Sequence, residues 1–219
     1  MHNSYGMDFY KIIFNILYEE HSKHTGVWLG NKQGRHYNLK KVLVDHICST
    51  DPDNIEGFID EQFLNYMDNY KTSLTILYSK ILHRVKKETN VEITGRIKSG
   101  DAIILKLHRK RFEDDGKFPL NKYLNDLLGF RIIDDNFGNN IYEIPLQLND
   151  LKTQNKRIIH KMRENGEYSG YHVYFMGANS SYFPMELQIW NSKNARKNFE
   201  SHEMYKKEYT YWPQIYNKG

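Results

Sequence analysis

The stretch VEITGRIKSGDAIILKLHR, residues 91–109, contains the transition on which the fold depends. Residues 91–98 alternate between apolar and polar side chains, which indicates a β-strand. Ser99-Gly100-Asp101 is typical of a turn with a helix cap, and the sequence beyond it predicts a helix over residues 102–109. A helix that starts directly after a strand and a tight turn presents backbone amides that favour anions.

Three basic residues gather around this turn. Arg96 and Lys98 are two residues apart on the predicted strand, so their side chains point to the same face. Lys106 lies about one turn inside the predicted helix. The cluster is suited to holding a triphosphate, although a solvated basic face has the same spacing.

The region before this stretch, residues 1–90, is predicted to be helical and to pack on the rest of the domain. Apolar residues recur at helical spacing from Phe9 to Leu17. A second helix is predicted after Asp51-Pro52-Asp53, which we interpret as its turn and cap. Its apolar stripe comprises Phe63, Met67, Tyr70, Leu74, Leu77 and Ile81.

The region after this stretch mixes strands and helices. The patterns predict strands over residues 129–133, 171–176 and 183–189, with a hairpin-like loop over residues 178–181. They predict helices after Pro119, over residues 150–162 and over residues 194–209. Helices followed by mixed strands and helices indicate one α+β domain with a helical N-terminal region.

Composition limits the class of protein. The chain has 219 residues with 39% hydrophobic side chains, enough for a packed core. Its single cysteine, Cys48, excludes an intrachain disulfide and is compatible with a reducing interior. A secretory leader pattern and an apolar run of spanning length are both missing. We therefore expect a cytoplasmic protein with no membrane partner, whose net charge of +4 mildly favours anionic ligands.

Three further motifs offer candidate chemistry. Asp126 lies near a predicted helix end, three residues before Gly129, and could offer a hard oxygen ligand to magnesium. In Gly170-Tyr171, the glycine allows a close bend and the ring could stack on a base. On the last predicted strand Glu186 and Gln188 share one face, which lines either a pocket or a sheet edge. Each motif is weak when taken alone.

Taken in order, these motifs resemble the synthetase domain of Rel/SpoT-type alarmone enzymes and of the small alarmone synthetases. The resemblance covers about residues 95–206 and lacks the His-Asp motif of the hydrolase domain, so a synthetase alone is implied. It implies a nucleotidyltransferase-like mixed sheet flanked by helices. Residues 91–219 would form this catalytic domain, with a C-terminal helix and an aromatic tail over residues 209–216.

The resemblance also implies roles at the matching positions. Pyrophosphate would pass from ATP to an acceptor hydroxyl, which attacks the β-phosphorus while AMP leaves. Residues expected to bind ATP are Arg96, Lys98, Lys106 and Arg131. Residues expected to hold Mg²⁺ and act in catalysis are Asp126 and Glu186, and Glu186 would also take the hydroxyl proton. Residues expected to bind the acceptor are Gly170, Tyr171, Gln188 and His202.

The sequence departs from the family pattern mainly around the acceptor. Ala102 replaces a serine of the ATP stretch, and Trp190-Asn191 replaces Arg-Thr. Glu167 and Phe175 stand where alarmone synthetases typically have a lysine before Gly-Tyr and a histidine four residues after the tyrosine. A negative charge at the acceptor phosphates disfavours free GDP.

These departures resemble a toxic subgroup that pyrophosphorylates the 3′ CCA end of tRNA, blocking aminoacylation and translation. The leading hypothesis is therefore a tRNA-modifying toxin neutralised by a protein antitoxin. An alarmone synthetase that uses GDP, GTP or an adenine nucleotide is the second hypothesis, and a catalytically weak RNA-binding module is the third. DNA is not an expected partner. Candidate RNA contacts are Lys40, Lys41, Lys86, Lys87, Arg109, Lys156 and Arg157.

Overall fold

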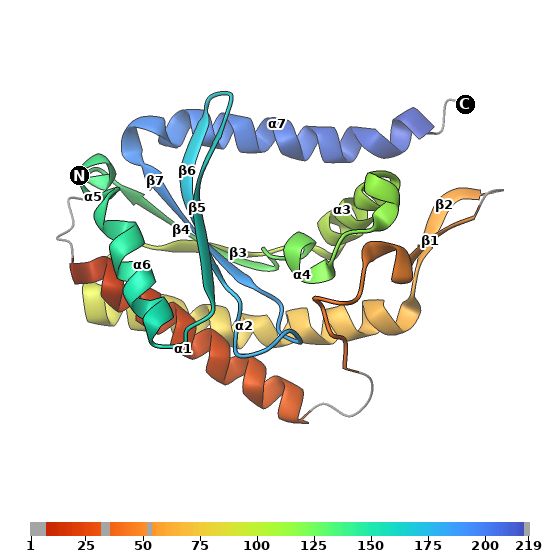
Figure 1. Ribbon diagram of the computed structural model, residues 1–219. Helices are drawn as coiled ribbons and strands as arrows, with labels where there is room; N and C mark the ends of the chain where they lie inside the picture. Colours follow the sequence, from red (N-terminus) through yellow and green to blue (C-terminus); the bar gives the residue numbers. More distant parts are fainter. Residues whose placement is uncertain (1–7, 32–35, 52–53, 217–219) are drawn as a thin grey trace.

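The computed structural model describes the backbone of residues 8–31, 36–51 and 54–216 (Figure 1). The first elements are α1 (Asp8–Asn31), the 3-10 helix η1 (Val44–His46), β1 (Cys48–Asp51), β2 (Asn54–Ile59) and α2 (Glu61–Thr89). They are followed by β3 (Thr94–Ile97), α3 (Gly100–Phe112), η2 (Asp114–Gly116), α4 (Leu120–Tyr123) and β4 (Leu128–Asp134). The chain continues through α5 (Phe137–Asn140), α6 (Glu143–Thr153), β5 (Ile158–Asn165), β6 (Tyr168–Phe175), β7 (Met185–Asn191) and α7 (Ser192–Tyr216).

A five-stranded mixed sheet organises the molecule. Its strand order is β3-β4-β7-β6-β5, in which β4 and β7 run parallel and the other neighbours run antiparallel. Pairing places Gly129 opposite Glu186, and His172 opposite Gln188. The α+β class with a mixed sheet flanked by helices is thereby confirmed.

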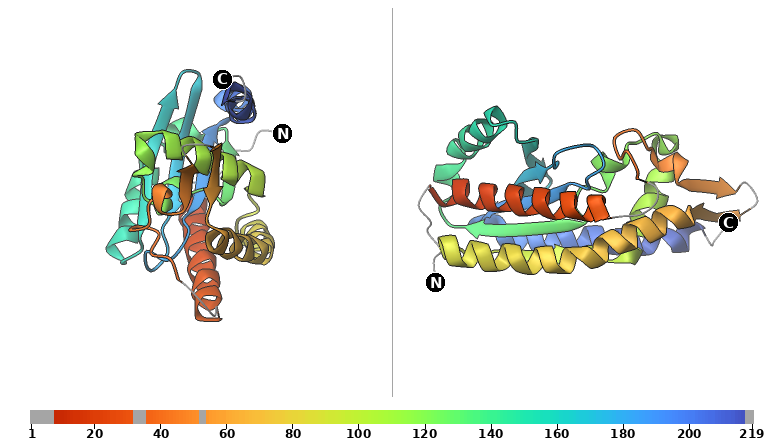
Figure 2. Two further views of the ribbon diagram at one scale, coloured as in Figure 1. Left: turned by 90° about the vertical axis from the view of Figure 1, so that its right-hand side faces the viewer. Right: turned by 90° about the horizontal axis from the view of Figure 1, so that it is seen from below.

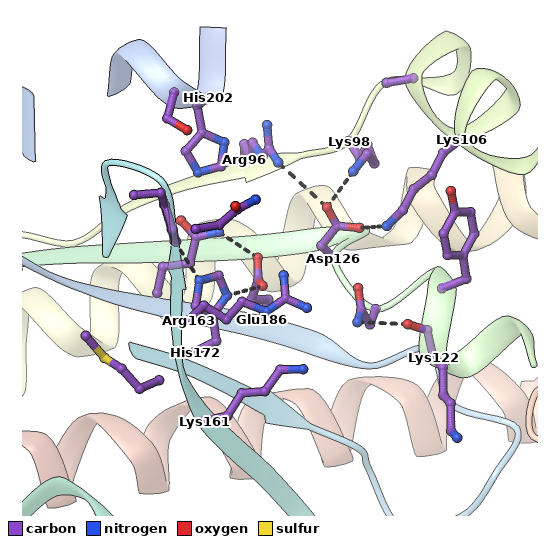
Figure 3. A pocket seen from close by; sticks show the side chains of 18 of the residues that line it. Arg96, Lys98, Lys106, Lys122, Asp126, Lys161, Arg163, His172, Glu186 and His202 are labelled. Carbon is purple, nitrogen blue, oxygen red and sulfur yellow. Dashed lines mark hydrogen bonds and ion pairs between the residues drawn. The ribbon is translucent and has the colours of Figure 1, made fainter. Parts of the chain in front are cut away.

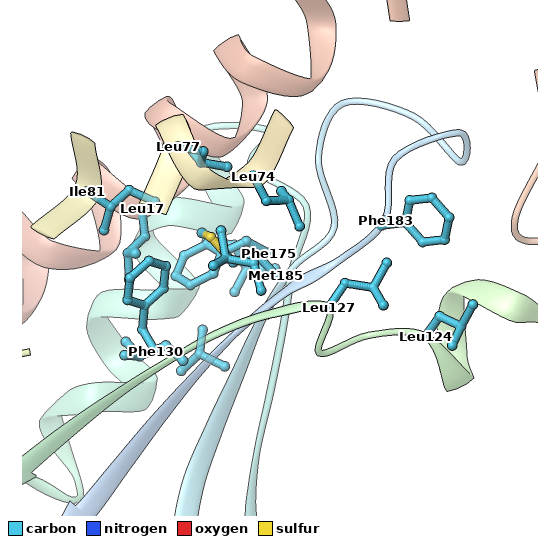
Figure 4. Packing of buried hydrophobic residues seen from close by; sticks show 14 of the residues in the cluster. Leu17, Leu74, Leu77, Ile81, Leu124, Leu127, Phe130, Phe175, Phe183 and Met185 are labelled. Atoms are coloured by element: carbon cyan, nitrogen blue, oxygen red, sulfur yellow. The ribbon is translucent and has the colours of Figure 1, made fainter. Parts of the chain in front are cut away.

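The helices cover the two faces of this sheet differently. α1 and α2 lie side by side across one face, whereas α7 runs across the other (Figures 1 and 2). Apolar side chains of β4, β6 and β7 meet the two N-terminal helices in a buried core (Figure 4). Because successive strand residues point to opposite faces, the intervening side chains, among them Glu186 and Gln188, face α7 instead.

The two predicted N-terminal stripes are core, as expected for amphipathic helices, except that Ile12 of the first stripe is exposed. Phe9, Ile13 and Leu17 of α1 are buried, and the whole predicted α2 stripe is buried with them. The cap of α2 is Asp60, whose carboxylate accepts a hydrogen bond from the amide of Phe63 at 2.7 Å. The predicted cap at Asp51-Pro52-Asp53 is wrong, because β2 lies between these residues and the helix.

The sequence prediction also missed the hairpin of β1 and β2. Neither strand lies in the main sheet, and the hairpin projects beside α3 (Figure 1). The side chain of Arg111 in α3 donates a hydrogen bond to the carbonyl of Cys48 at 2.9 Å. A tertiary contact of this kind leaves no periodic pattern in the sequence of the hairpin.

The helix predicted over residues 150–162 is wrong beyond Thr153. α6 ends at Thr153, and Asn155 adopts a left-handed conformation with φ of 61° that interrupts the helix. Residues 158–165 instead form β5 at the edge of the sheet, paired with β6 across a turn at Gly166. The predicted helix after Pro119 is only the single turn α4.

The remaining predicted elements exist with shifted ends. Ser99 caps α3, where its hydroxyl accepts a hydrogen bond from the amide of Ala102. The closing helix α7 extends through the predicted aromatic tail, whose side chains lie outside the described part of the chain. None of the helices that the structure describes is long and apolar enough to cross a membrane.

Candidate active site

A pocket of about 950 Å³ opens on the sheet face that lies opposite the two N-terminal helices (Figure 3). Side chains of β6 and β7 form its floor, β3 and α3 contribute one side, β5 contributes another, and α7 contributes Ser201 and His202. The predicted site residues that line this pocket are Arg96, Lys98, Lys106, Asp126, Glu186, Gln188 and His202. Segments far apart in the sequence therefore meet here.

Asp126 lies just before β4 and is surrounded by cations. Its Oδ2 accepts a hydrogen bond from Lys98 Nζ at 2.5 Å, and its Oδ1 accepts one from Lys106 Nζ at 3.1 Å. Arg96 Nη2 lies 3.7 Å from Oδ2. Burial alone would raise the pKa of Asp126, but the two lysines outweigh it and hold this pKa well below its usual range.

Glu186, the second carboxylate, is held by a buried chain of hydrogen bonds. Trp190 Nε1 donates to Tyr168 Oη at 3.1 Å, and Tyr168 Oη is 2.6 Å from His172 Nε2. His172 Nδ1 lies 2.8 Å from Glu186 Oε1, and Gln188 Nε2 donates to Oε2 at 2.9 Å. Burial raises the pKa of Glu186, yet the contact with His172 outweighs it and lowers that pKa overall.

Arg131 is held firmly beside this chain. Its Nε and Nη2 donate to Gln188 Oε1 at 3.2 and 3.0 Å, and its guanidinium lies 3.5 Å over the centre of the Trp190 ring. Burial lowers the pKa of Arg131 to about 10, and repulsion by Arg96 adds to the shift. The structure thus places Arg131 close to Arg96 but stacks it on Trp190, a residue not among the sequence-based candidates.

Two predicted acceptor residues do not line the pocket. Tyr171 pairs with Ile189 and shares the core face of the sheet, where its hydroxyl lies 2.6 Å from His160 Nδ1. Gly170 faces the pocket side but is covered, because a Cβ there would lie 2.8 Å from Trp190 and 2.9 Å from Tyr168 Oη. Tyr168 stands in their place, and it lines the pocket.

His202 reaches the pocket from α7. Its ring stacks on Trp190 with centroids 5.5 Å apart, and its Nε2 is buried without a hydrogen-bond partner among the described atoms. Burial first, and then repulsion by Arg131 and Arg96, lowers its pKa to about 4, so the imidazole is neutral at pH 7. A neutral ring nitrogen here can hydrogen-bond a ligand without adding charge.

Residues 95–210, a little over half of the chain, match the family model described as "Region found in RelA / SpoT proteins". The chain belongs to the RelA/SpoT family. It is accordingly an enzyme of the pyrophosphokinase type. No curated relative matches the sequence of this RelA/SpoT chain.

Solved structures similar to this RelA/SpoT chain include two small alarmone synthetases. Small alarmone synthetase 2 from Bacillus subtilis is 21% identical, over 67% of this chain and 80% of its own, with a TM-score of 0.39. Small alarmone synthetase 1 from the same organism is 19% identical, over 68% and 81%, with a TM-score of 0.44. The latter protein bound to AMPCPP is 17% identical, over 68% and 81%, with a TM-score of 0.38.

The two departures that directed the sequence prediction toward tRNA lie outside the pocket of this RelA/SpoT chain. Glu167 is exposed in the β5–β6 turn and pairs with Lys197 of α7 at 2.8 Å. Phe175 is fully buried in the core on the other face of the sheet. Tyr168 and His172 of β6 are also a tyrosine and a histidine four residues apart, and these two side chains share the pocket face.

Two cations of β5, which the sequence analysis did not assign to the acceptor site, also face the pocket. Lys161 pairs with His172, and Arg163 pairs with Gly170, so both basic side chains face the pocket, and both line it. Neither forms an ion pair with a carboxylate within the described chain. Their spacing of two residues is a strand signal, but the prediction of a helix over residues 150–162 concealed it.

The predicted RNA contacts are not brought together. Lys86 and Lys87 lie in the last turn of α2, at one end of the molecule, whereas α3 with Arg109 lies at the other (Figure 1). Arg109 pairs with Glu113 at 2.7 Å, and Lys156 contacts Asn15 of α1. Lys40 and Lys41 precede η1, and Arg157 precedes β5. RNA contact at these positions remains a prediction.

Proposed function

We propose that this RelA/SpoT enzyme transfers pyrophosphate from ATP to a hydroxyl of a phosphate-bearing nucleotide. The observation that carries the proposal is the meeting of Asp126 and Glu186 in one pocket with three cations around Asp126 (Figure 3). Lys98, Lys106 and Arg96 supply positive charge on the side of α3, where a triphosphate would also meet the amides of the helix start.

The site also fits magnesium. Mg²⁺ in phosphate-transfer sites is typically held by one or two carboxylates together with substrate phosphates. Asp126 and Glu186 match that requirement, and the described residues contain no all-protein cluster of three or more ligands that would replace the phosphates. When bound, the ion would neutralise charge that develops on the transferred group.

The proposed reaction is a displacement at phosphorus. The acceptor hydroxyl oxygen forms a bond to the β-phosphorus of ATP. The bond from the β-phosphorus to the oxygen that it shares with the α-phosphorus breaks, and AMP leaves with that oxygen. Glu186 takes the hydroxyl proton, and His172 and Gln188 keep its carboxylate oriented. Catalysis consists mainly of alignment and charge neutralisation, as in other phosphoryl transfers.

The acceptor is proposed to lie on β5 and β6. The Tyr168 ring would stack on its base, while Lys161 and Arg163 would bind its phosphates. Because Glu167 and Phe175 lie outside the pocket, these two departures do not argue against a free nucleotide as acceptor. A guanine nucleotide such as GDP or GTP is therefore our first candidate acceptor.

The 3′ end of tRNA is the second candidate. Trp190 stands where the family typically has an arginine, so one cation of the family pattern is missing here. The singly charged phosphodiester of an RNA end requires fewer cations than a multiply charged terminal phosphate group. This departure favours an RNA acceptor, with toxicity and a protein antitoxin as the consequences proposed for the cell.

Transfer of label distinguishes these candidates. The enzyme is incubated with Mg²⁺ and ATP labelled in the β-phosphate, together with GDP, GTP or deacylated tRNA. A labelled guanine nucleotide supports the first candidate, and labelled RNA supports the second. Label in neither product would refute pyrophosphate transfer. The hypothesis of a catalytically weak RNA-binding module would then remain.

Asp126→Asn is the matched control for this assay. We expect it to abolish transfer, because the variant loses the carboxylate that contacts Lys98 and Lys106, the two lysines expected to bind ATP. The fold should remain, as shown by an unchanged circular dichroism spectrum. Retained transfer by the variant would remove Asp126 from the proposed metal site.

A further inference from the structure

The cations that surround Asp126 occupy both of its oxygens. Lys98 Nζ binds Oδ2 and Lys106 Nζ binds Oδ1, and all three side chains are buried to a similar degree, with 13–14% exposed. Arg96 approaches Oδ2 from the rim at 3.7 Å. The carboxylate contributes one negative charge and its neighbours contribute three positive charges, so the local balance is positive.

A positive local balance opposes a divalent cation. A free metal ion at Asp126 would have to displace two buried ammonium groups and then remain beside them in a site of lowered dielectric. The second carboxylate does not compensate, because Glu186 is itself bonded through both oxygens to His172 and Gln188.

A triphosphate reverses this balance. Its negative charges attract the ammonium groups of Lys98 and Lys106, and each lysine that turns toward a phosphate frees one oxygen of Asp126. The freed oxygen and the phosphate oxygens then form one anionic set of hard ligands.

We propose that Lys98 and Lys106 lock Asp126 against free divalent cations, so that the metal site forms only when a nucleoside triphosphate draws the lysines away. This inference rests on the proposed function only in naming ATP as the anion. By linkage, the metal must raise nucleotide affinity by the same factor by which the nucleotide raises metal affinity. Metal and nucleotide accordingly bind with positive cooperativity.

The lock predicts a gain of binding on mutation. Lys106→Gln removes the partner of Oδ1, so the variant should bind Mn²⁺ in the absence of nucleotide at least about tenfold more tightly than the wild type. The readout is the free Mn²⁺ signal in electron paramagnetic resonance during titration of the full chain. Lys98→Gln frees the other oxygen and serves as a second variant if the first does not fold.

The matched control is Lys122→Gln. Lys122 also lines the pocket but has no ion pair with a carboxylate among the described residues, so this variant removes one positive charge without releasing Asp126. Its Mn²⁺ affinity should equal that of the wild type. Asp126→Asn added to Lys106→Gln should abolish the gain.

Two outcomes would overturn the lock. One is a wild type that binds Mn²⁺ without nucleotide as tightly as Lys106→Gln, and the other is a gain that survives Asp126→Asn or appears equally in Lys122→Gln. These results are independent of transfer. If the wild type transfers no pyrophosphate but Lys106→Gln gains Mn²⁺ affinity, the proposed function is refuted and the lock is supported. If the wild type transfers pyrophosphate but Lys106→Gln gains no Mn²⁺ affinity, the lock is refuted and the proposed function is supported.

Discussion

Tyr168 and Tyr171 lie three residues apart on β6 and therefore point to opposite faces of the sheet. Tyr168 faces the pocket, where it contacts His172 and Trp190. Tyr171 faces the core helices and contacts His160. At the scale of single residues, this difference of face separates a candidate acceptor contact from a packing residue of the same type.

We expect Tyr168→Ala to raise the acceptor KM about tenfold or more, because base stacking on an aromatic ring is worth roughly 1–3 kcal/mol. The KM for ATP should change less, because Tyr168 is linked to Arg131 indirectly, through Trp190. Tyr171→Ala should leave both KM values near those of the wild type while lowering the free energy of unfolding, since this ring is buried. Steady-state kinetics with each substrate varied, and urea denaturation, measure these effects. A raised acceptor KM in Tyr171→Ala alone would return the role to Tyr171.

At the scale of elements, β6 and β7 approach each other closely where Gly170 lies under the Trp190 ring. A Cβ at Gly170 would lie 2.8 Å from the ring, closer than real contacts allow. Trp190 is fully buried and carries the guanidinium of Arg131 on its face, so it has little room to move. The same close contact therefore positions a residue predicted to bind ATP.

Gly170→Ala should destabilise the protein by about 1–3 kcal/mol, the usual cost of overpacking a core. It should also raise the KM for ATP by displacing Arg131. The control is Gly30→Ala in α1, where nothing lies within 4 Å of the added methyl group. That variant should be neutral or slightly stabilising in urea denaturation. Equal stabilities for the two variants would contradict the packing argument.

At the scale of the whole molecule, α1 is joined to the segment before β7 by a buried histidine. His21 Nε2 donates a hydrogen bond to the carbonyl oxygen of Phe183 at 2.9 Å. Burial lowers the pKa of His21 to about 4, and the bond to Phe183 only partly offsets this effect. The neutral ring is thus part of the contact between the N-terminal helices and the sheet.

This histidine makes stability depend on pH. The unfolded chain takes up a proton at His21 near pH 6.5, whereas the folded chain resists until about pH 4. The stabilising contribution is therefore complete above pH 6.5, and it is lost as pH falls through this window. We expect His21 to contribute a decrease of roughly 1.4 kcal/mol per pH unit in the free energy of unfolding there, and His202, whose pKa is also lowered to about 4, to add its own decrease.

Urea denaturation between pH 7 and pH 4 measures this slope. His21→Gln can still donate a hydrogen bond to Phe183 but cannot gain a proton, so its slope should be shallower by about the same amount. An unchanged slope in the variant would show that other groups cause the pH dependence.

Local patterns in the sequence determined much of the fold and half of the site. The stripes of α1 and α2 repeat at helical spacing because only one side of each helix is buried. Arg96, Lys98 and Lys106 could be grouped from residues 91–109 alone, because a strand, a capped turn and a helix place them near one another. The family pattern then associated them with Asp126 and Glu186.

Only the tertiary structure decided which side of β6 faces the pocket. Nearly every side chain of β6 is buried, on both faces, so its sequence lacks the alternation that reveals a face. A shift in register by an odd number of residues exchanges the two faces, and three residues separate Tyr171 from Tyr168. Pairing with β5 and β7 settles the face, and it also brings Lys161, Arg163 and Trp190 to the site from other segments.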